Sequence, residues 1–250
     1  MGEIKILFHG KLNDFLPAGR KNRFIEVNFN HKTAIKHVIE SLGVPHPEVS
    51  VIRGINGTVG FDYHIRDQDI IEVFPVIAAP DDEKPDPPSF VLDNHLGKLT
   101  GYLRILGFDA LYNHAWDDSM LAEIASTQDR TLLTRDRGLL KRKIIISGYC
   151  VRADLPQDQI LEVLHHFQLH GLIMPFYRCS RCNGILEQVE KKVIIDQLQP
   201  LTRIYFNEFT RCRQCGQIYW KGSHYDKIEG FIRQIIQKNQ NILNNDPSSW

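Results

Sequence analysis

Alternating apolar and polar positions predict strands in the first third of the chain. The segments with this period of two are residues 4–8, 23–29 and 69–74. Between them, Thr33 is the predicted N-cap of a helix over residues 34–42, which Gly43 is expected to end. Asn56-Gly57 is a tight-turn signal between two apolar runs. The predicted order is strand, strand, helix, strand, strand.

The middle of the chain changes to short apolar runs that alternate with helical patterns. Leu96, Leu99, Leu103 and Leu106 recur at steps of three and four, which predicts an amphipathic helix ending at Gly107. The predicted strands here are residues 90–92, 108–113, 131–134 and 144–146. Two further helices are predicted, one from Asp118 onward and one over residues 156–169. Such alternation favours an α/β fold with a three-layer, mostly parallel sheet.

Proline-rich and C-terminal segments mark the domain boundaries. The segment before residue 89 is polar and rich in proline, so we expect a linker there. A final amphipathic helix is expected to carry Ile228, Phe231, Ile232, Ile235 and Ile236 on one face. The predicted domains are residues 1–79, 89–172 and 173–238, joined by a linker over 80–88 and followed by a flexible tail over 239–250.

Composition indicates whether the chain can form cores, cross a membrane or be secreted, and it does not change the predicted elements. Apolar residues make up 42% of the 250 positions, which is enough to form real cores. No run approaches the roughly 18 unbroken apolar residues of a membrane span, and the N-terminus lacks a secretory pattern. We therefore expect a cytoplasmic protein with no membrane partner.

Charge is spread unevenly although the net charge is zero. Residues 81–170 contain 10 Lys/Arg and 14 Asp/Glu, whereas residues 171–250 contain 11 and 7. An acidic middle beside a basic C-terminal part is compatible with an acidic metal site next to an anion-binding surface.

Four of the five cysteines form two C-x-x-C motifs, Cys179-Ser-Arg-Cys182 and Cys212-Arg-Gln-Cys215. Each motif can place two thiolates on one tetrahedral ion, so two motifs predict a four-sulfur zinc site. Four sulfurs leave no open position, which makes the expected Zn²⁺ structural. The 29 residues between the motifs are compatible with an inserted hairpin. Cys150 is left over and is expected to be a buried, inert thiol.

Acidic residues follow the ends of the apolar runs. Asp93 follows one predicted strand directly, Asp136 follows another within two residues, and Asp118 begins a predicted helix. Ligands of an open parallel sheet bind beyond the carboxyl ends of its strands, so these carboxylates are expected at one rim. Grouped carboxylates need a cation, which predicts one or two Mg²⁺ or Mn²⁺ ions able to support phosphodiester hydrolysis. Each aspartate alone also fits a plainer role, as an N-cap or a solvated loop residue.

Three stretches of sequence carry a family resemblance. "LDNHLGKLTGYLRILGFD" contains Asp93, "DSMLAEIA" begins at Asp118, and "RTLLTRD" ends at Asp136. Together they resemble the PIN-like ribonucleases, and with the paired C-x-x-C motifs the whole chain resembles the Mut-seven C-terminal ribonuclease family. That resemblance implies a PIN-like core followed by a zinc ribbon, and a metal-dependent ribonuclease whose catalytic metal ligands are these three aspartates.

Asp117 is an alternative to Asp118 as a ligand. We prefer Asp118 because Leu121, Ala122 and Ala125 then fall at the offsets expected of the family helix. PIN nucleases usually use four acids, and only three are clear here. Glu123 is not expected to supply the fourth. It lies five residues after Asp118, a helical rotation of about 500°, so it points well away from the face that carries Asp118.

The N-terminal pattern resembles the β-grasp, or ubiquitin-like, fold. The passage "HPEVSVIRGINGTVGFDYHIRDQDIIEVFPVIA" is similar to the sulfur-carrier branch of that fold. Sulfur carriers work through a free C-terminal Gly-Gly, but here the chain continues through Ala78, Ala79 and Pro80. Sulfur-carrier chemistry is therefore not expected, and docking of a protein partner or a stabilising role is.

Basic residues complete the predicted site. Arg104, Arg135, Arg137 and Lys141 are the expected contacts to RNA phosphates. Cations and aromatics are interleaved around the cysteines: Arg178, Arg181, Arg203, Arg211, Arg213, Lys221, Tyr177, Tyr205, Phe206, Phe209, Tyr219 and Trp220. They suit single-stranded RNA, although the same aromatics would also fill the core of a small ribbon. Two functions stay open: a metal-dependent ribonuclease, and a non-catalytic RNA-binding or assembly adaptor that uses the ribbon and the β-grasp domain.

Overall fold

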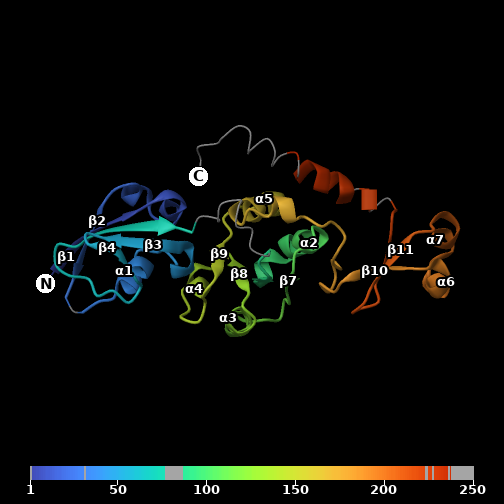
Figure 1. The fold of residues 1–250 in the computed structure, drawn as a ribbon, viewed down its shortest axis with the longest axis horizontal. Helices are drawn as coiled ribbons and strands as arrows, with labels where there is room; N and C mark the ends of the chain where they lie inside the picture. Colours follow the sequence, from blue (N-terminus) through green and yellow to red (C-terminus); the bar gives the residue numbers. More distant parts are fainter. Residues whose placement is uncertain are drawn as a thin grey trace. The chain divides into compact units, whose positions relative to one another are not determined.

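The structure is a computed structural model of the 250-residue chain, and it describes residues 2–30, 32–76, 87–222, 225–226, 228–235 and 237. The chain is mixed α/β and divides into two compact units (Figure 1). One unit takes residues 1–83 and 116–151, and the other takes residues 84–115 and 152–250. Most of the predicted linker over residues 80–88 and the predicted tail over 239–250 lie outside the described residues.

A five-stranded mixed sheet forms the N-terminal part of the first unit. Its strands are β1 (Gly2–Phe8), β2 (Ile25–Phe29), β3 (Val49–Gly54), β4 (Gly57–Val59) and β5 (Ile70–Pro75), in the order β2-β1-β5-β3-β4. β1 is parallel to β5 and antiparallel to β2, while β3 is antiparallel to β4 and β5. Helix α1 (Ile35–Ser41) lies between β2 and β3 in the chain and buries its apolar side chains. The predicted β-grasp order is confirmed.

The start of α1 differs from the sequence prediction. The N-cap residue is Ala34, whose side chain makes no capping hydrogen bond, so the prediction of Thr33 as N-cap is wrong. The backbone N–H of Ile35 instead donates to the carbonyl of Tyr63 at 2.8 Å, and that of Lys36 donates to the carbonyl of Phe61. A loop from the same domain thus satisfies N–H groups that a cap would otherwise serve.

Short connecting helices of 3-10 type complete the N-terminal domain. They are η1 (Gly10–Phe15), η2 (Ala18–Arg20) and η3 (His46–Glu48). Gly43 follows α1 with a φ of 104°, a left-handed conformation that favours glycine, so its predicted role at the helix end is confirmed.

The rest of the first unit is built from α3 (Asp118–Thr127), β8 (Thr131–Thr134), α4 (Arg137–Leu140) and β9 (Gly148–Cys150). β8 and β9 pair in parallel, as predicted for this region. The predicted strand over residues 144–146 is wrong, because Ile144 and Ile146 are exposed and only Ile145 is buried. The strand begins at Gly148, where a Cβ atom would lie 2.6 Å from Leu140 and 3.3 Å from the Leu132 carbonyl. Close packing against β8 therefore requires glycine at this position, and the strand forms there instead of at the β-branched residues 144–146.

The second unit begins with a parallel strand pair covered by helices. Its elements are β6 (Phe90–Leu92), η4 (Asn94–Leu96), α2 (Gly97–Ile105), β7 (Ala110–Leu111), α5 (Pro156–His166) and η5 (His170–Leu172). The four leucines of the predicted stripe, Leu96, Leu99, Leu103 and Leu106, are all buried. The α2 prediction is confirmed, and Gly107 follows it with a φ of 98°. The PIN-like three-layer arrangement and the domain boundaries stay predictions.

An antiparallel sheet of three strands surrounds the cysteines. The elements are β10 (Leu186–Val189), α6 (Lys191–Ile194), η6 (Ile195–Gln197), α7 (Pro200–Tyr205), β11 (Phe209–Cys212) and β12 (Ile218–Trp220), and the strand order is β10-β11-β12. Two short α-helices and one 3-10 helix lie between β10 and β11, which pair antiparallel. Ile194 and Leu198 from this insertion form a small core with Phe209, so the insertion builds its own hydrophobic contacts.

The C-terminal part is helical at residues 225–226, 228–235 and 237, in line with the predicted amphipathic helix. Ile232 and Ile235 are buried, and the Phe231 ring lies 4.4 Å from that of Tyr102. Ile236 lies outside the described side chains. Within the described residues, none of the helices combines the length and the apolar character needed to cross a bilayer.

Candidate functional site

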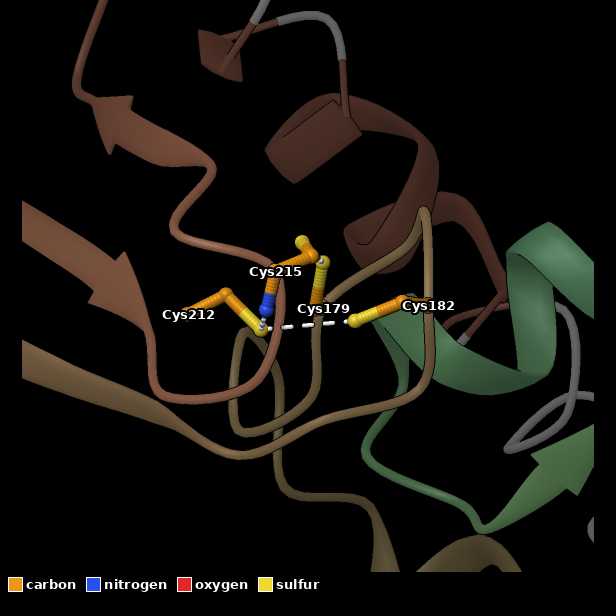
Figure 2. A group of neighbouring side chains, drawn as sticks. All are labelled: Cys179, Cys182, Cys212 and Cys215. Carbon is orange, nitrogen blue, oxygen red and sulfur yellow. Dashed lines mark hydrogen bonds between the residues drawn. The ribbon is translucent and has the colours of Figure 1, made fainter.

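The four paired cysteines form a compact sulfur cluster. Their Sγ atoms lie within 4.8 Å of one another, with 3.7 Å between Cys179 and Cys215 and 3.4 Å between Cys182 and Cys212 (Figure 2). A tetrahedral zinc ion with Zn–S bonds of about 2.3 Å requires sulfurs about 3.8 Å apart. The observed spacing and the all-thiol donor set therefore fit zinc, and the cluster could hold it.

Backbone turns place each cysteine pair. The N–H of Asn183 donates to the Cys179 carbonyl, and the N–H of Gly216 donates to the Cys212 carbonyl. Both donor residues have a positive φ, of 72° and 73°. At Gly184, a Cβ atom would lie 2.9 Å from the Cys212 sulfur, so only glycine lets the two loops approach this closely.

Burial and hydrogen bonds give the thiols of Cys182 and Cys212 different pKa values. Burial raises the pKa of the Cys182 thiol to about 12. Burial also acts to raise the pKa of Cys212, but hydrogen bonds from the backbone N–H groups of Cys215 and Gln214 outweigh it and bring that pKa to about 7. A zinc ion would displace the remaining thiol protons, since thiolates are its ligands.

Tyr219 adds a polar contact to the cluster. Its hydroxyl lies 3.1 Å from the Cys179 sulfur and 3.3 Å from the Ser180 hydroxyl, and burial raises the Tyr219 pKa to about 12. An O–H of this kind supports a metal-bound thiolate from outside the ligand shell. Tyr219 was predicted among aromatics that either stack on bases or fill the ribbon's core, and spacing in the sequence does not signal this contact.

Arg104 anchors the first cysteine loop within the second unit. Its side chain is 6% exposed, its Nε donates to the Ala110 carbonyl, and its Nη1 donates to the carbonyls of Ser180 and Arg181. Burial lowers the pKa of Arg104, while the neighbouring cysteine thiols oppose that shift. The predicted contact of Arg104 with RNA phosphate does not fit this geometry, because the guanidinium is buried and bonded to backbone carbonyls.

Asn183 makes the matching contact from the cysteine loop. Its Oδ1 accepts from the Ala110 N–H at 3.1 Å, and its Nδ2 donates to Asp109 Oδ1 at 2.8 Å. Arg178 also pairs with Asp109, at 3.3 Å. The edge of β7 and the first cysteine loop are therefore joined by a partly buried polar network, which sequence spacing alone does not signal.

The predicted acids take local capping roles in the structure. Asp93 follows β6, is 4% exposed, and accepts a hydrogen bond from the His95 N–H at 2.8 Å as the N-cap of η4. Asp136 follows β8 by two residues and caps α4 by accepting from the Gly138 N–H at 2.6 Å. Both positions match the prediction of carboxylates directly after strands.

Asp117 and Asp118 divide their roles at the start of α3. Asp117 is the N-cap, accepting from the Met120 N–H at 2.8 Å, whereas Asp118 is the first helical residue and its side chain is 53% exposed. The Asp118 carboxylate lies 4.0 Å from Arg142 and takes no capping bond. Asp93 belongs to one compact unit and Asp118 and Asp136 to the other, so the joint metal site of the three stays a prediction.

Two predicted phosphate contacts bond to the N-terminal domain instead. Arg137 Nη1 donates to the Phe15 carbonyl at 3.2 Å, and its guanidinium lies 5.0 Å from the centre of the Phe15 ring. Lys141 Nζ donates to the Glu40 carbonyl at 2.7 Å. Arg135 is exposed and also has partners. Arg135 and Arg137 are therefore both exposed on either side of Asp136.

The aromatics and cations around the sulfur cluster separate into two groups. Phe206 and Phe209 belong to the core of the small sheet, while Tyr177, Tyr205 and Trp220 are exposed. Several cations are held by the chain itself: Arg178 by Asp109, Arg203 by the Leu198 carbonyl, Arg213 by Glu187 and Lys221 by Glu208. A groove of about 1130 Å³ within this unit is lined by Phe176, Tyr219, Trp220, Lys221, Tyr225 and Ile228 among others.

Comparison with known proteins places both parts of the chain. The family model of the Mut7-C RNAse domain matches residues 88–232, and that of the Mut7-C ubiquitin domain matches residues 1–81. No curated protein matches the chain. A solved structure of a protein assigned as molybdopterin converting factor, subunit 1, from Pyrococcus furiosus is 15% identical, with a TM-score of 0.25, covering 31% of this chain and 100% of that one. Since the RNAse-domain match alone spans more than half of the residues, the chain belongs to the Mut7-C RNAse domain family and carries the Mut7-C ubiquitin domain at its N-terminus.

Proposed function

We propose that this protein is a metal-dependent ribonuclease that hydrolyses RNA phosphodiester bonds, with Asp93, Asp118 and Asp136 as ligands of Mg²⁺ or Mn²⁺. The observation that carries the proposal is the position of the acids inside the matched RNAse domain. Asp93 and Asp136 each follow a strand of a parallel pair, where ligands of α/β sheets bind, and Asp118 presents an exposed carboxylate at a helix start.

The donor set suits a hard divalent cation. Carboxylate oxygens are the ligands that Mg²⁺ and Mn²⁺ prefer. An ion bound there would activate water and stabilise the charge that develops at phosphorus. Asp93 and Asp136 are oriented by the N–H groups that they cap, so their second carboxylate oxygens are directed by the backbone. Arg135 or Arg137, which are both exposed beside Asp136, is the phosphate contact of the proposal.

The sulfur cluster has a different role in this proposal. Zn²⁺ bound by Cys179, Cys182, Cys212 and Cys215 has no open coordination position, so it stabilises the small three-stranded sheet as a zinc ribbon. The hydrogen bonds of Arg104 and Asn183 then link the zinc-bound loop to α2 and β7.

The test uses Asp93→Asn and Asp136→Asn. Asparagine caps helices as well as aspartate does, so both variants keep the local fold while they lose a charged ligand. We expect Mn²⁺ binding and Mn²⁺-dependent RNA cleavage in the wild-type chain, and loss of both in the double variant. His95→Gln is the matched control, because it removes a neighbouring side chain that makes a 3.4 Å contact with Asp93 but no ligand of the proposed ion. Unchanged cleavage in the double variant would contradict the proposal.

The groove in the second unit favours a second candidate, an RNA-binding adaptor without catalysis. The Phe176 and Tyr225 rings stack at 4.4 Å, and Trp220 is 37% exposed, so aromatic faces of the kind that hold unpaired bases line it. An adaptor should bind single-stranded RNA equally well in EDTA and in Mn²⁺ and should not cleave it. A ribonuclease should cleave only with the metal.

A further inference from the structure

Four polar contacts join the ubiquitin-like domain to the segment that follows Asp136, and all lie within one compact unit. They pair Phe15 with Arg137, Glu40 with Lys141, His46 with Ile145 and Glu48 with Cys150. Arg137 is the residue next to Asp136, and Cys150 is the last residue of β9, which pairs with β8. The contacts therefore hold both ends of the segment 137–150.

Glu48 covers the outer edge of β9. The N–H of Val151 donates inward to the Thr134 carbonyl of β8, while the N–H of Cys150 points the other way and donates to Glu48 Oε1 at 2.7 Å. Glu48 is 4% exposed, and its own carbonyl accepts from the Val76 N–H, at the end of β5. A buried carboxylate is stable only when it is hydrogen-bonded, so this contact is specific and not incidental packing.

His46 links two acceptors. Its Nδ1 lies 2.7 Å from Glu40 Oε1, and its Nε2 lies 2.8 Å from the Ile145 carbonyl oxygen. The imidazole therefore bridges a carboxylate of the ubiquitin-like domain and a backbone carbonyl of the segment that follows Asp136. His46 is 7% exposed and lies edge-on to Phe61 at 5.9 Å, which shields the link from water.

We infer that the ubiquitin-like domain is a built-in positioning element of the Asp136 site, acting through His46 and Glu48. The domain fixes segment 137–150 at both ends, and this segment includes α4, the helix that Asp136 caps through Gly138. The orientation of the Asp136 carboxylate therefore depends on a domain that contributes no ligand. This inference rests on the proposed function, in which Asp136 binds the metal.

The experiment compares His46→Ala with His37→Ala in the full-length chain. His37 is an exposed histidine on α1 of the same domain, so it controls for loss of an imidazole from that domain. We expect His46→Ala to raise amide hydrogen exchange across residues 138–150 by about 10- to 100-fold, as for a lost buried hydrogen bond, while β1 and β5 stay protected. Mn²⁺ affinity should fall in the same variant, and His37→Ala should match the wild type in both measurements.

Glu48 provides a second, independent variant pair. Glu48→Ala should raise exchange at Cys150 more than Glu48→Gln, because glutamine keeps an oxygen that can accept from the Cys150 N–H. Unchanged exchange over residues 138–150 in both alanine variants would overturn the inference, as would a uniform rise across β1–β5. Faster exchange with unchanged Mn²⁺ affinity would refute only the positioning role. Absence of Mn²⁺ binding in the wild-type chain would refute the proposed function instead.

Discussion

The four cysteines and the three aspartates are two candidate ligand sets that the chain builds in opposite ways. The cysteines come as local pairs, and the pairing of Leu186 with Cys212 and of Arg178 with Ile185 brings the two pairs together. The aspartates come from three separate ends of strands and helices, and they lie in both compact units. Two ligands with only two residues between them are brought together by the local sequence. Ligands on distant elements are brought together only by the tertiary fold.

The two sets also differ in what each ligand does without a metal. The cysteine sulfurs face one another at 3.4–3.7 Å, an arrangement that could hold an ion. Two of the three aspartates, Asp93 and Asp136, each cap a helix, so each has a structural reason to be present whether or not a metal binds. Variants that separate capping from metal binding are therefore the sharpest tests of the acidic set.

The largest effect is expected from Cys212→Ser. Loss of one ligand should release zinc and disorder β10–β12, because structural zinc contributes about 10 kcal/mol or more to folding in zinc-finger peptides. Zinc per chain after desalting and hydrogen exchange of the three strands measure it. Cys150→Ser is the control, because Cys150 lies in β9, outside the cluster, and its zinc content should stay at the wild-type value. Full zinc occupancy in Cys212→Ser would place the ion elsewhere.

An intermediate effect is expected from Asp118→Asn compared with Asp117→Asn. Asparagine preserves the α3 cap at position 117, so that variant should keep Mn²⁺ binding. Loss of a charge beside a divalent ion should weaken binding at position 118 by about 2–3 kcal/mol, roughly 100-fold. Titration of Mn²⁺ into both variants decides between the two aspartates. The reverse order of effects would make Asp117 the ligand and Asp118 a surface residue.

An effect of similar size, on stability instead of metal binding, is expected from Arg104→Met compared with Arg213→Met. Arg104 is buried and bonded to three carbonyls, so its replacement should cost about 2–3 kcal/mol of unfolding free energy. Arg213 is exposed and paired with Glu187, so its replacement should cost less than about 1 kcal/mol. Denaturant unfolding measures both values. A loss of RNA affinity in Arg104→Met at unchanged stability would restore Arg104 as a phosphate contact.

Local patterns predicted the elements where one face of a strand or helix packs on a core. The stripe from Leu96 to Leu106 is buried as expected, and the alternation in residues 4–8 places Ile4, Ile6 and Phe8 inside. The pattern failed at residues 144–146, where β-branched residues suggested a strand but the parallel partner of β8 needed Gly148 for close approach. Propensity describes a single segment, whereas strand pairing depends on the neighbour.

Polar side chains were harder to assign than apolar ones. Arg104, Arg137 and Lys141 are cations in a region expected to bind RNA, and the sequence gives them the same meaning as Arg135. The structure separates them, because Arg104 is buried against the cysteine loop while Arg137 and Lys141 bond to the ubiquitin-like domain. The residue type tells which groups a charged side chain can bind. The tertiary fold determines which of those groups lies next to it.

The sequence by itself determined the β-grasp order, the leucine stripe of α2, the two cysteine pairs and the acids that follow β6 and β8, because each depends on spacing within a short segment. Only the tertiary structure decided the roles of His46, Glu48 and Arg104. Their bonds reach Ile145, Cys150 and Ser180, which lie 99, 102 and 76 positions away along the chain. Buried polar groups must find hydrogen-bond partners, and the partner is whichever backbone atom the fold brings within reach.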